Sequence, residues 1–232
     1  MIKRFIKVAI AILSFSILSS CATGIVKVSK LSDLPPEINT NNLPDASQHP
    51  DCDGVILYEN IVFDVDYVSG VGIETYMTVH KVYRVFRNEE NFMKNNISFG
   101  RNTVFESFAG RTIKPDGTTI DLNAEDVYVR TVERNNKDFK SKFYSAEYNL
   151  PALQKGDIIE IKYTSINRYF YFSGVYWVQE RLPKKYSRFE VRIPNFIFDL
   201  DLGYKFVHTT KNIEIKEPSF EKGFGDSGDR SY

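Results

Sequence analysis

Cysteine is scarce in this sequence, and its scarcity excludes a disulfide-rich scaffold. The 232 residues contain only Cys21 and Cys52, whereas small disulfide frameworks use four or more cysteines. A long apolar run is lacking as well. The most apolar stretch, Val8–Leu18, has eleven residues, and a permanent transmembrane helix needs about 20. The 42% of hydrophobic residues nevertheless suffice for one sizeable packed domain.

Neither sign of charge is in excess, which argues against a nucleic-acid partner. Lys plus Arg and Asp plus Glu both number 30, and nucleic-acid-binding domains are typically basic. The sequence has no contiguous basic block of the kind that would predict electrostatic binding to anionic lipid. Glycine-rich phosphate loops and Gly-x-Ser-x-Gly are absent. The sequence therefore gives no support to a nucleotide-binding or serine-hydrolase role.

The first twenty residues have the layout of an export signal. Three cations precede the short apolar stretch Val8–Leu18, and the small residues Ser19 and Ser20 follow it. The ending Leu18-Ser19-Ser20-Cys21 resembles the bacterial lipobox, in which the cysteine thiol receives a diacylglyceryl group before cleavage. The resemblance implies that Cys21 is lipid-anchored. The alternative is an ordinary secretory signal in which Cys21 is incidental.

Acylation of Cys21 would place the protein in the bacterial cell envelope. Durable anchoring takes two or three acyl chains, because a single chain binds a membrane only marginally. Ala22 follows the cysteine in place of aspartate. By analogy with enteric bacteria, this favours the outer membrane, facing the periplasm or the surface.

The rest of the chain divides into three parts. Residues 21–50 are rich in proline and asparagine and have no sustained apolar period, which predicts a flexible tether. The alternative is that the later part of this segment packs on the domain. Residues 51–207 are predicted to form the folded domain. Residues 208–232 are predicted to be irregular, because Gly, Asp and Ser are frequent and no strand pattern is present from Ser219 on.

Period-two patterning predicts an all-β fold for the domain. Phe63, Val65 and Tyr67 alternate with aspartates, and Ile159, Ile161 and Tyr163 alternate with polar residues. Lys114-Pro115-Asp116-Gly117 is a strong hairpin signal, and only Asn88–Lys94 suggests a turn of helix. Strands with one wet face each predict an antiparallel β-sandwich. The prediction leaves open that the final strand of this sandwich is missing.

Four segments together resemble a domain of unknown function that precedes transglutaminase-like domains in bacterial envelope proteins. The resemblance covers roughly residues 49–200 and rests on the order and spacing of the segments. It implies a β-sandwich with no known catalytic residues. The papain-like Cys-His-Asp domain that usually follows in the family is not present in this chain. The matching stretches are His49–Leu57, Arg111–Gly117, Leu150–Glu160 (through Lys155-Gly156-Asp157) and Tyr176–Gln179 with Leu182-Pro183.

An aromatic cluster is the most suggestive candidate for a ligand site. Outward-facing rings could stack on sugars or hold a peptide. The favoured alternative is that the rings are covered, because large aromatic side chains are mostly buried. The candidate residues are Tyr169, Tyr171, Tyr176 and Trp177.

Other reactive side chains give weaker signals. His49 and Cys52 are three residues apart, but a short loop spacing does not orient the third group that nucleophilic catalysis needs. The Asp-x-Asp pairs lack a complete calcium loop, and the three histidines have no metal-ligand spacing. His80 shares a strand face with Thr78 and Arg84 and is predicted to be exposed. The sequence therefore predicts no catalytic residue, metal or cofactor.

Three functions remain open at this stage. The first is a lipid-anchored, non-catalytic module that binds a protein, peptide or glycan or acts as a scaffold. The second is an accessory or truncated part of a transglutaminase-like or cysteine peptidase system, with catalysis in a separate chain. The third is a structural envelope subunit.

Overall fold

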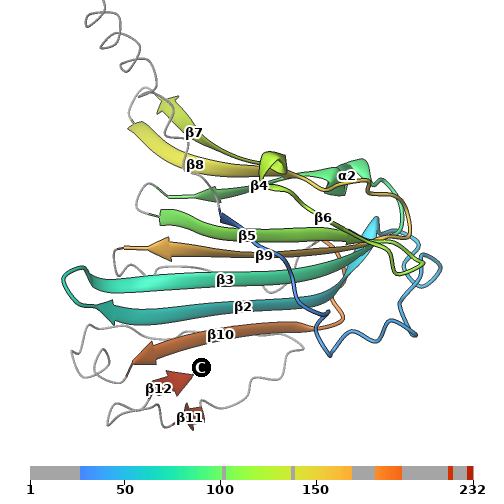
Figure 1. Cartoon of the computed structure of the whole chain (residues 1–232), viewed down its shortest axis with the longest axis horizontal. Helices are drawn as coiled ribbons and strands as arrows, with labels where there is room; N and C mark the ends of the chain where they lie inside the picture. Colours follow the sequence, from blue (N-terminus) through green and yellow to red (C-terminus); the bar gives the residue numbers. More distant parts are fainter. Residues whose placement is uncertain are drawn as a thin grey trace, which may run out of the picture.

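The computed structural model describes residues 27–100, 103–136, 139–168, 181–194, 219–221 and 229–231, and these fold into two β-sheets (Figure 1). The larger sheet runs, in spatial order, β1 (Lys27–Val28), β5 (Thr103–Ile113), β9 (Ile158–Asn167), β3 (Gly72–Val85), β2 (Gly54–Val68), β10 (Ser187–Pro194), β12 (Asp229–Ser231) and β11 (Ser219–Glu221), with β6 (Thr119–Asp121) beside β5.

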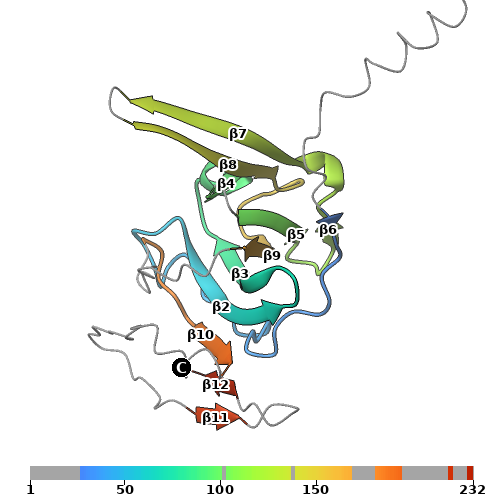
Figure 2. The same ribbon diagram turned by 90° about the vertical axis from the view of Figure 1, so that its left-hand side faces the viewer.

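The smaller sheet has three strands in the order β4 (Lys94–Phe99), β8 (Phe139–Asn149) and β7 (Val127–Asn136) (Figure 2). Helix is confined, among the described residues, to the single turn α2 (Glu90–Met93) and the 3-10 turn η1 (Ala124–Asp126). The predicted turn of helix at Asn88–Lys94 is thereby confirmed. Within the part of the chain that the structure describes, no helix has the length and apolarity to cross a bilayer.

Strand pairing confirms the predicted all-β, antiparallel β-sandwich. Most neighbouring strands are antiparallel, as in the long ladder from Gly54↔Val85 to Val68↔Gly72 between β2 and β3. Two pairs are parallel, β1 with β5 and β10 with β2. The predicted hairpin turn is also present: the Gly117 amide donates to the Lys114 carbonyl at 2.9 Å, and Gly117 adopts φ +87°.

The core of the sandwich lies between the two sheets, on what we call the inner face of the larger sheet. Phe108 of β5 and Ile159 and Ile161 of β9 point to this side. Ala146 and Tyr148 of β8 meet them from the smaller sheet, and the rings of Phe108 and Tyr148 lie 4.7 Å apart between centroids. Strand alternation places these residues on one face, as the apolar pattern of the sequence predicts.

The opposite, outer face of the larger sheet is covered by the N-terminal segment. Val55, Tyr58, Val82 and Ile158 are buried there, and part-buried side chains of the segment pack against them. The segment is also tied by backbone, because the Ser29 amide donates to the Phe108 carbonyl at 2.9 Å. Within the segment 21–50, the described residues from Lys27 on pack on the domain, which agrees with the alternative to a flexible tether, because their scattered apolar side chains meet a sheet face. They are Leu34, Ile38, Leu43 and Ala46.

Short strands extend the larger sheet beyond β10. Arg192 of β10 pairs with Ser231 of β12, and Phe220 of β11 pairs with Arg230 of β12. The prediction that Ser219 to Tyr232 contains no strand is wrong for these residues. Three-residue strands are too short to show alternation, and the backbone groups of a neighbouring strand edge recruit them regardless of side-chain pattern.

Candidate functional site

A network of polar and ionisable side chains crosses three strands on the outer face. Arg111 lies on β5, Glu160 on β9 and His80 on β3. Arg111 and Glu160 are register partners, whereas His80 is paired with Lys162. All three side chains leave the sheet on one side, because Glu160 alternates with the inward-facing Ile159 and Ile161. The pleat therefore brings together residues that are 49 and 80 positions apart in the sequence.

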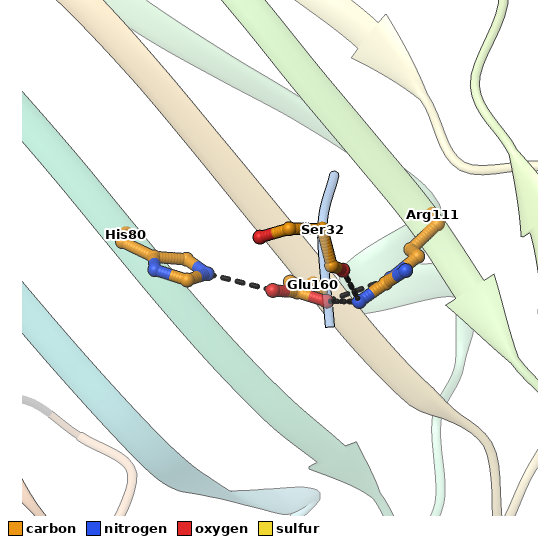
Figure 3. A network of polar contacts seen from close by, with 4 residues as sticks. All are labelled: Ser32, His80, Arg111 and Glu160. Atoms are coloured by element: carbon orange, nitrogen blue, oxygen red, sulfur yellow. Dashed lines mark hydrogen bonds and ion pairs between the residues drawn. The ribbon is translucent and has the colours of Figure 1, made fainter. Parts of the chain in front are cut away.

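Both oxygens of the Glu160 carboxylate are occupied (Figure 3). His80 Nε2 lies 2.7 Å from Glu160 Oε1, and Arg111 Nε donates to Glu160 Oε2 at 2.7 Å. Arg111 also donates from its terminal nitrogen to the Ser32 carbonyl at 2.7 Å. Glu160 is almost fully buried, with 1% of its side chain exposed. The network therefore neutralises a buried acid and clasps the N-terminal segment to the sheet.

Aromatic rings continue the network toward β10. The Tyr58 ring meets the His80 ring edge-on at 5.3 Å and stacks on Tyr186 at 5.2 Å with parallel planes. Burial raises the pKa of the Tyr58 phenol above its ordinary value, and the charge of Glu37 adds to the rise. These rings hold the imidazole in a fixed orientation. The predicted exposure of His80 is wrong, because only 17% of its side chain is accessible.

A second buried carboxylate, Glu59 of β2, lies on the inner face. Lys81 Nζ is 2.8 Å from Glu59 Oε1. Lys184 Nζ and Ser187 Oγ both donate to Glu59 Oε2 at 2.6 Å. Lys184 lies just before β10 and Ser187 is the first residue of β10. Glu59 therefore holds β10 in its parallel pairing with β2.

A third buried acid, Asp157, fixes the approach to β9. Its Oδ2 accepts hydrogen bonds from Lys114 Nζ and from the Gln154 amide, each at 2.7 Å. Lys114 begins the β5–β6 turn. The interaction therefore joins that turn to the loop before β9.

The His49–Cys52 pair considered for catalysis has a structural setting. The His49 ring stacks on Phe86 at 6.1 Å, and the Cys52 amide donates to the His49 carbonyl. Cys52 is a free, part-exposed thiol. Next to it, Asp53 accepts hydrogen bonds from the Asn88 and Asn91 side chains, which anchors the turn α2. No third group that would orient His49 for proton transfer is recorded among the described residues.

Several residues singled out from the sequence lie outside the described residues. They are Cys21 and the aromatic candidates Tyr169, Tyr171, Tyr176 and Trp177. Sequence reasoning in turn missed the Glu160 and Glu59 networks. Alternation marks Glu160 as a polar residue on a strand, but only the strand order shows which cations stand beside it. Within the described part of the chain, no group of three or more His, Cys, Asp or Glu side chains could hold a metal.

Comparison with solved structures shows a similar fold. A "putative protease" from Parabacteroides distasonis superposes with a TM-score of 0.55 and 12% sequence identity, over 77% of this chain and 34% of the other. The chain thus spans about a third of the length of that protein. A "putative nutrient binding protein" from Legionella pneumophila matches with a TM-score of 0.31 and 10% identity, over 77% and 62% of the two chains. At such identities the first match shows a shared fold alone.

No curated protein sequence matches the chain. Comparison with protein-family models, in contrast, assigns a family. The profile described as "Domain of Unknown Function with solved-structure structure (DUF3857)" matches residues 74–230. The match begins and ends later than the resemblance seen in the sequence, and it takes in β10, β11 and the first two residues of β12. Because it covers well over half of the 232 residues, the chain belongs to the DUF3857 family.

Proposed function

We propose that this protein is a lipoprotein of the bacterial envelope whose β-sandwich is a non-catalytic binding or scaffolding module. Cys21 carries the lipid in this proposal, and the ligand is a protein, a peptide or a glycan. The observation that carries the proposal is the set of contacts made by the buried carboxylates of Glu160, Glu59 and Asp157. Each is held by cations and hydrogen-bond donors of the same chain.

A catalytic acid or base has to reach its substrate, either directly or through one water. Glu160 meets His80 with one oxygen and Arg111 with the other, and Glu59 is likewise contacted on both oxygens. Buried ion pairs of this kind fix one arrangement of the chain more reliably than they add stability. The networks are therefore suited to holding strands and the N-terminal segment in register.

The anchor and the location rest on the sequence. The charged start, the short apolar stretch Val8–Leu18 and the Leu-Ser-Ser-Cys ending support export and acylation. Ala22 supports the outer membrane, with the domain facing the periplasm or the surface. The aromatic candidates Tyr169, Tyr171, Tyr176 and Trp177 remain the proposed contacts for a ligand.

Two measurements test this proposal. Intact-mass analysis of the protein from cell membranes is expected to show a chain that begins at an acylated Cys21, and the Cys21→Ala variant is expected to leave the membrane fraction. The acylated chain is then tested for binding to envelope extracts and glycan arrays. Tyr176→Ala/Trp177→Ala should weaken binding, whereas the exposed Tyr128→Ala serves as control. An unmodified Met1 on a cytosolic species would contradict the anchor.

A second candidate function is supported by the fold comparison. The matched structure is called a "putative protease", and this chain covers about a third of it. The chain would then be an accessory part of a transglutaminase-like or cysteine peptidase system whose catalytic domain is separate. A neighbouring reading frame with Cys, His and Asp in that order would favour this candidate. Hydrolase activity of this chain that is lost in Cys52→Ala would refute the non-catalytic reading.

A further inference from the structure

We infer that one end of the sandwich rests directly on the lipid surface to which Cys21 is anchored. We call it the turn end and define it by Tyr67 and Val71, at the β2–β3 turn, and Val104, at the start of β5. The inference rests on the proposed acylation of Cys21. In this arrangement the domain lies on the bilayer. A long flexible tether would instead hold it away from the membrane.

The connection between anchor and sheet is short. β1 begins at Lys27, six residues after Cys21, and six residues span at most about 20 Å when fully extended. A flexible tether of residues 21–50 would span roughly 100 Å at the same rise. β1 runs parallel to β5, with Lys27 opposite Ser107. The chain therefore enters the sheet from the side on which β5 begins, which is the side of the turn end.

The strand registers give the distance from Lys27 to the turn end. Ser107 lies four residues from Thr103, where β5 starts. Thr103 and Thr75 both pair with Asn167, and Thr75 pairs with Val65. The β2–β3 ladder continues three residues further, to Val68. These seven residues correspond to roughly 23 Å at the rise of a β-strand. The link of at most about 20 Å is shorter than the roughly 23 Å from Lys27 to the β2–β3 turn. The turn therefore reaches the level of the anchored cysteine even when the link is fully extended.

The turn end exposes the side chains that a lipid interface favours. Tyr67 is 57% exposed, Val71 55% and Val104 41%, although large apolar side chains are normally buried. Figure 1 shows the β2–β3 turn and the start of β5 on the same, left-hand side of the molecule. Tyrosine is enriched where a membrane meets water, because its ring is apolar and its hydroxyl is polar.

Asp66 also lies at this end, beside the β2–β3 turn. The short link and the exposed apolar residues therefore carry the inference.

Labels at two ends of the acylated full chain test the inference. In a Cys52→Ser background, single cysteines are placed at the turn end (Val71→Cys, Val104→Cys) and at exposed Lys155 near the opposite end (Lys155→Cys). Each carries a bimane fluorophore, and the proteins are reconstituted into phosphatidylcholine–phosphatidylglycerol vesicles. We expect doxyl-labelled lipid to shift emission to the blue and to quench it at residues 71 and 104. Emission at residue 155 should stay that of an aqueous label.

Intact mass and flotation of the same samples separate two kinds of failure. If the chain is acylated and floats with the vesicles while all three labels remain aqueous, the turn end does not rest on lipid and the inference is wrong, although the proposed anchor stands. If residue 155 is quenched and residues 71 and 104 are not, the domain is seated by another surface and the inference is wrong. If the chain carries no lipid, the proposed function and the inference both fail.

Discussion

The two faces of the larger sheet differ in what covers them, although each buries apolar side chains and one acid, Glu59 on the inner face and Glu160 on the outer face. The inner face buries Phe108, Ile159 and Ile161 against the smaller sheet, and ring contacts link the layers. The outer face carries the Arg111–Glu160–His80 network, and an irregular segment covers it in place of a sheet. Burial of apolar side chains stabilises the fold but is not directional, whereas a buried ion pair requires two particular side chains to lie next to each other. The comparison indicates that the inner face keeps the domain folded and the outer face fixes where its N-terminal segment lies.

The largest effect is expected on the inner face. Phe108→Ala removes a fully buried ring that contacts Tyr148 across the sheets. Deleting a buried phenylalanine typically costs about 3–5 kcal/mol, through lost apolar burial and a residual cavity. Urea unfolding followed by circular dichroism measures the loss. Tyr128→Ala is the matched control, because this ring is 58% exposed; equal losses in both variants would contradict the assignment of the core.

A smaller loss is expected on the outer face from Glu160→Gln. The change leaves His80 and Arg111 without their anion, and breaking a buried pair costs about 3–5 kcal/mol. Because 17% of His80 and 11% of Arg111 is exposed, water screens part of this penalty, and we expect about 2–3 kcal/mol. The same urea titration provides the measurement.

The triple replacement His80→Leu/Arg111→Met/Glu160→Leu sharpens the comparison. It removes every charge of the network at once, and replacing a complete buried ion network by apolar residues is often neutral or stabilising. We therefore expect unfolding stability close to wild type while the clasp on Ser32 is lost. Stability as low as that of Glu160→Gln would mean that the outer face depends on charge for cohesion as well.

The strands and their core could be predicted from the sequence, but the outer-face network could not. Alternation around Ile159 and Ile161 indicates which side of β9 is apolar, and Pro115-Asp116-Gly117 specifies the β5–β6 hairpin, because both signals are local. The meeting of His80, Glu160 and Arg111 depends on β3, β9 and β5 being neighbours, over 49 and 80 residues of sequence. The packing of residues 34–46 was only an alternative to a flexible tether for the same reason: four isolated apolar residues have no period. The aromatic candidates at 169–177 remain predictions.

A more local effect is expected from Arg111→Lys. One ammonium cannot reproduce the guanidinium fork that reaches both Glu160 and the Ser32 carbonyl. We expect a loss of about 1 kcal/mol. A charged hydrogen bond contributes about 1.5–3 kcal/mol, but the bond to the Ser32 carbonyl is exposed and screened by water, and the bond to Glu160 is retained. Unfolding in urea measures it. Arg130→Lys, in an exposed pair with Glu147, should change stability by less than about 0.5 kcal/mol.

The smallest effect is expected at alkaline pH on the inner face. Burial raises the pKa of Tyr148 well above its ordinary value. The unfolded chain then loses the phenol proton at a lower pH than the folded chain, so stability is fully present below about pH 10 and falls as the pH rises further. Tyr148→Phe should show a shallower fall between pH 9 and 11 when urea midpoints are compared. An unchanged slope would mean that this ring is not buried in solution.

Hydrogen–deuterium exchange of the N-terminal segment tests most directly whether it belongs to the fold. The Ser29 amide donates to Phe108 and the Ile38 amide to Pro35, and Arg111 fastens Ser32 from the sheet. We predict that peptides over residues 28–46 of the wild-type chain exchange slowly, and that Arg111→Lys speeds exchange there without affecting β2 and β3. Exchange of these amides at the rate of an unstructured chain would contradict the account.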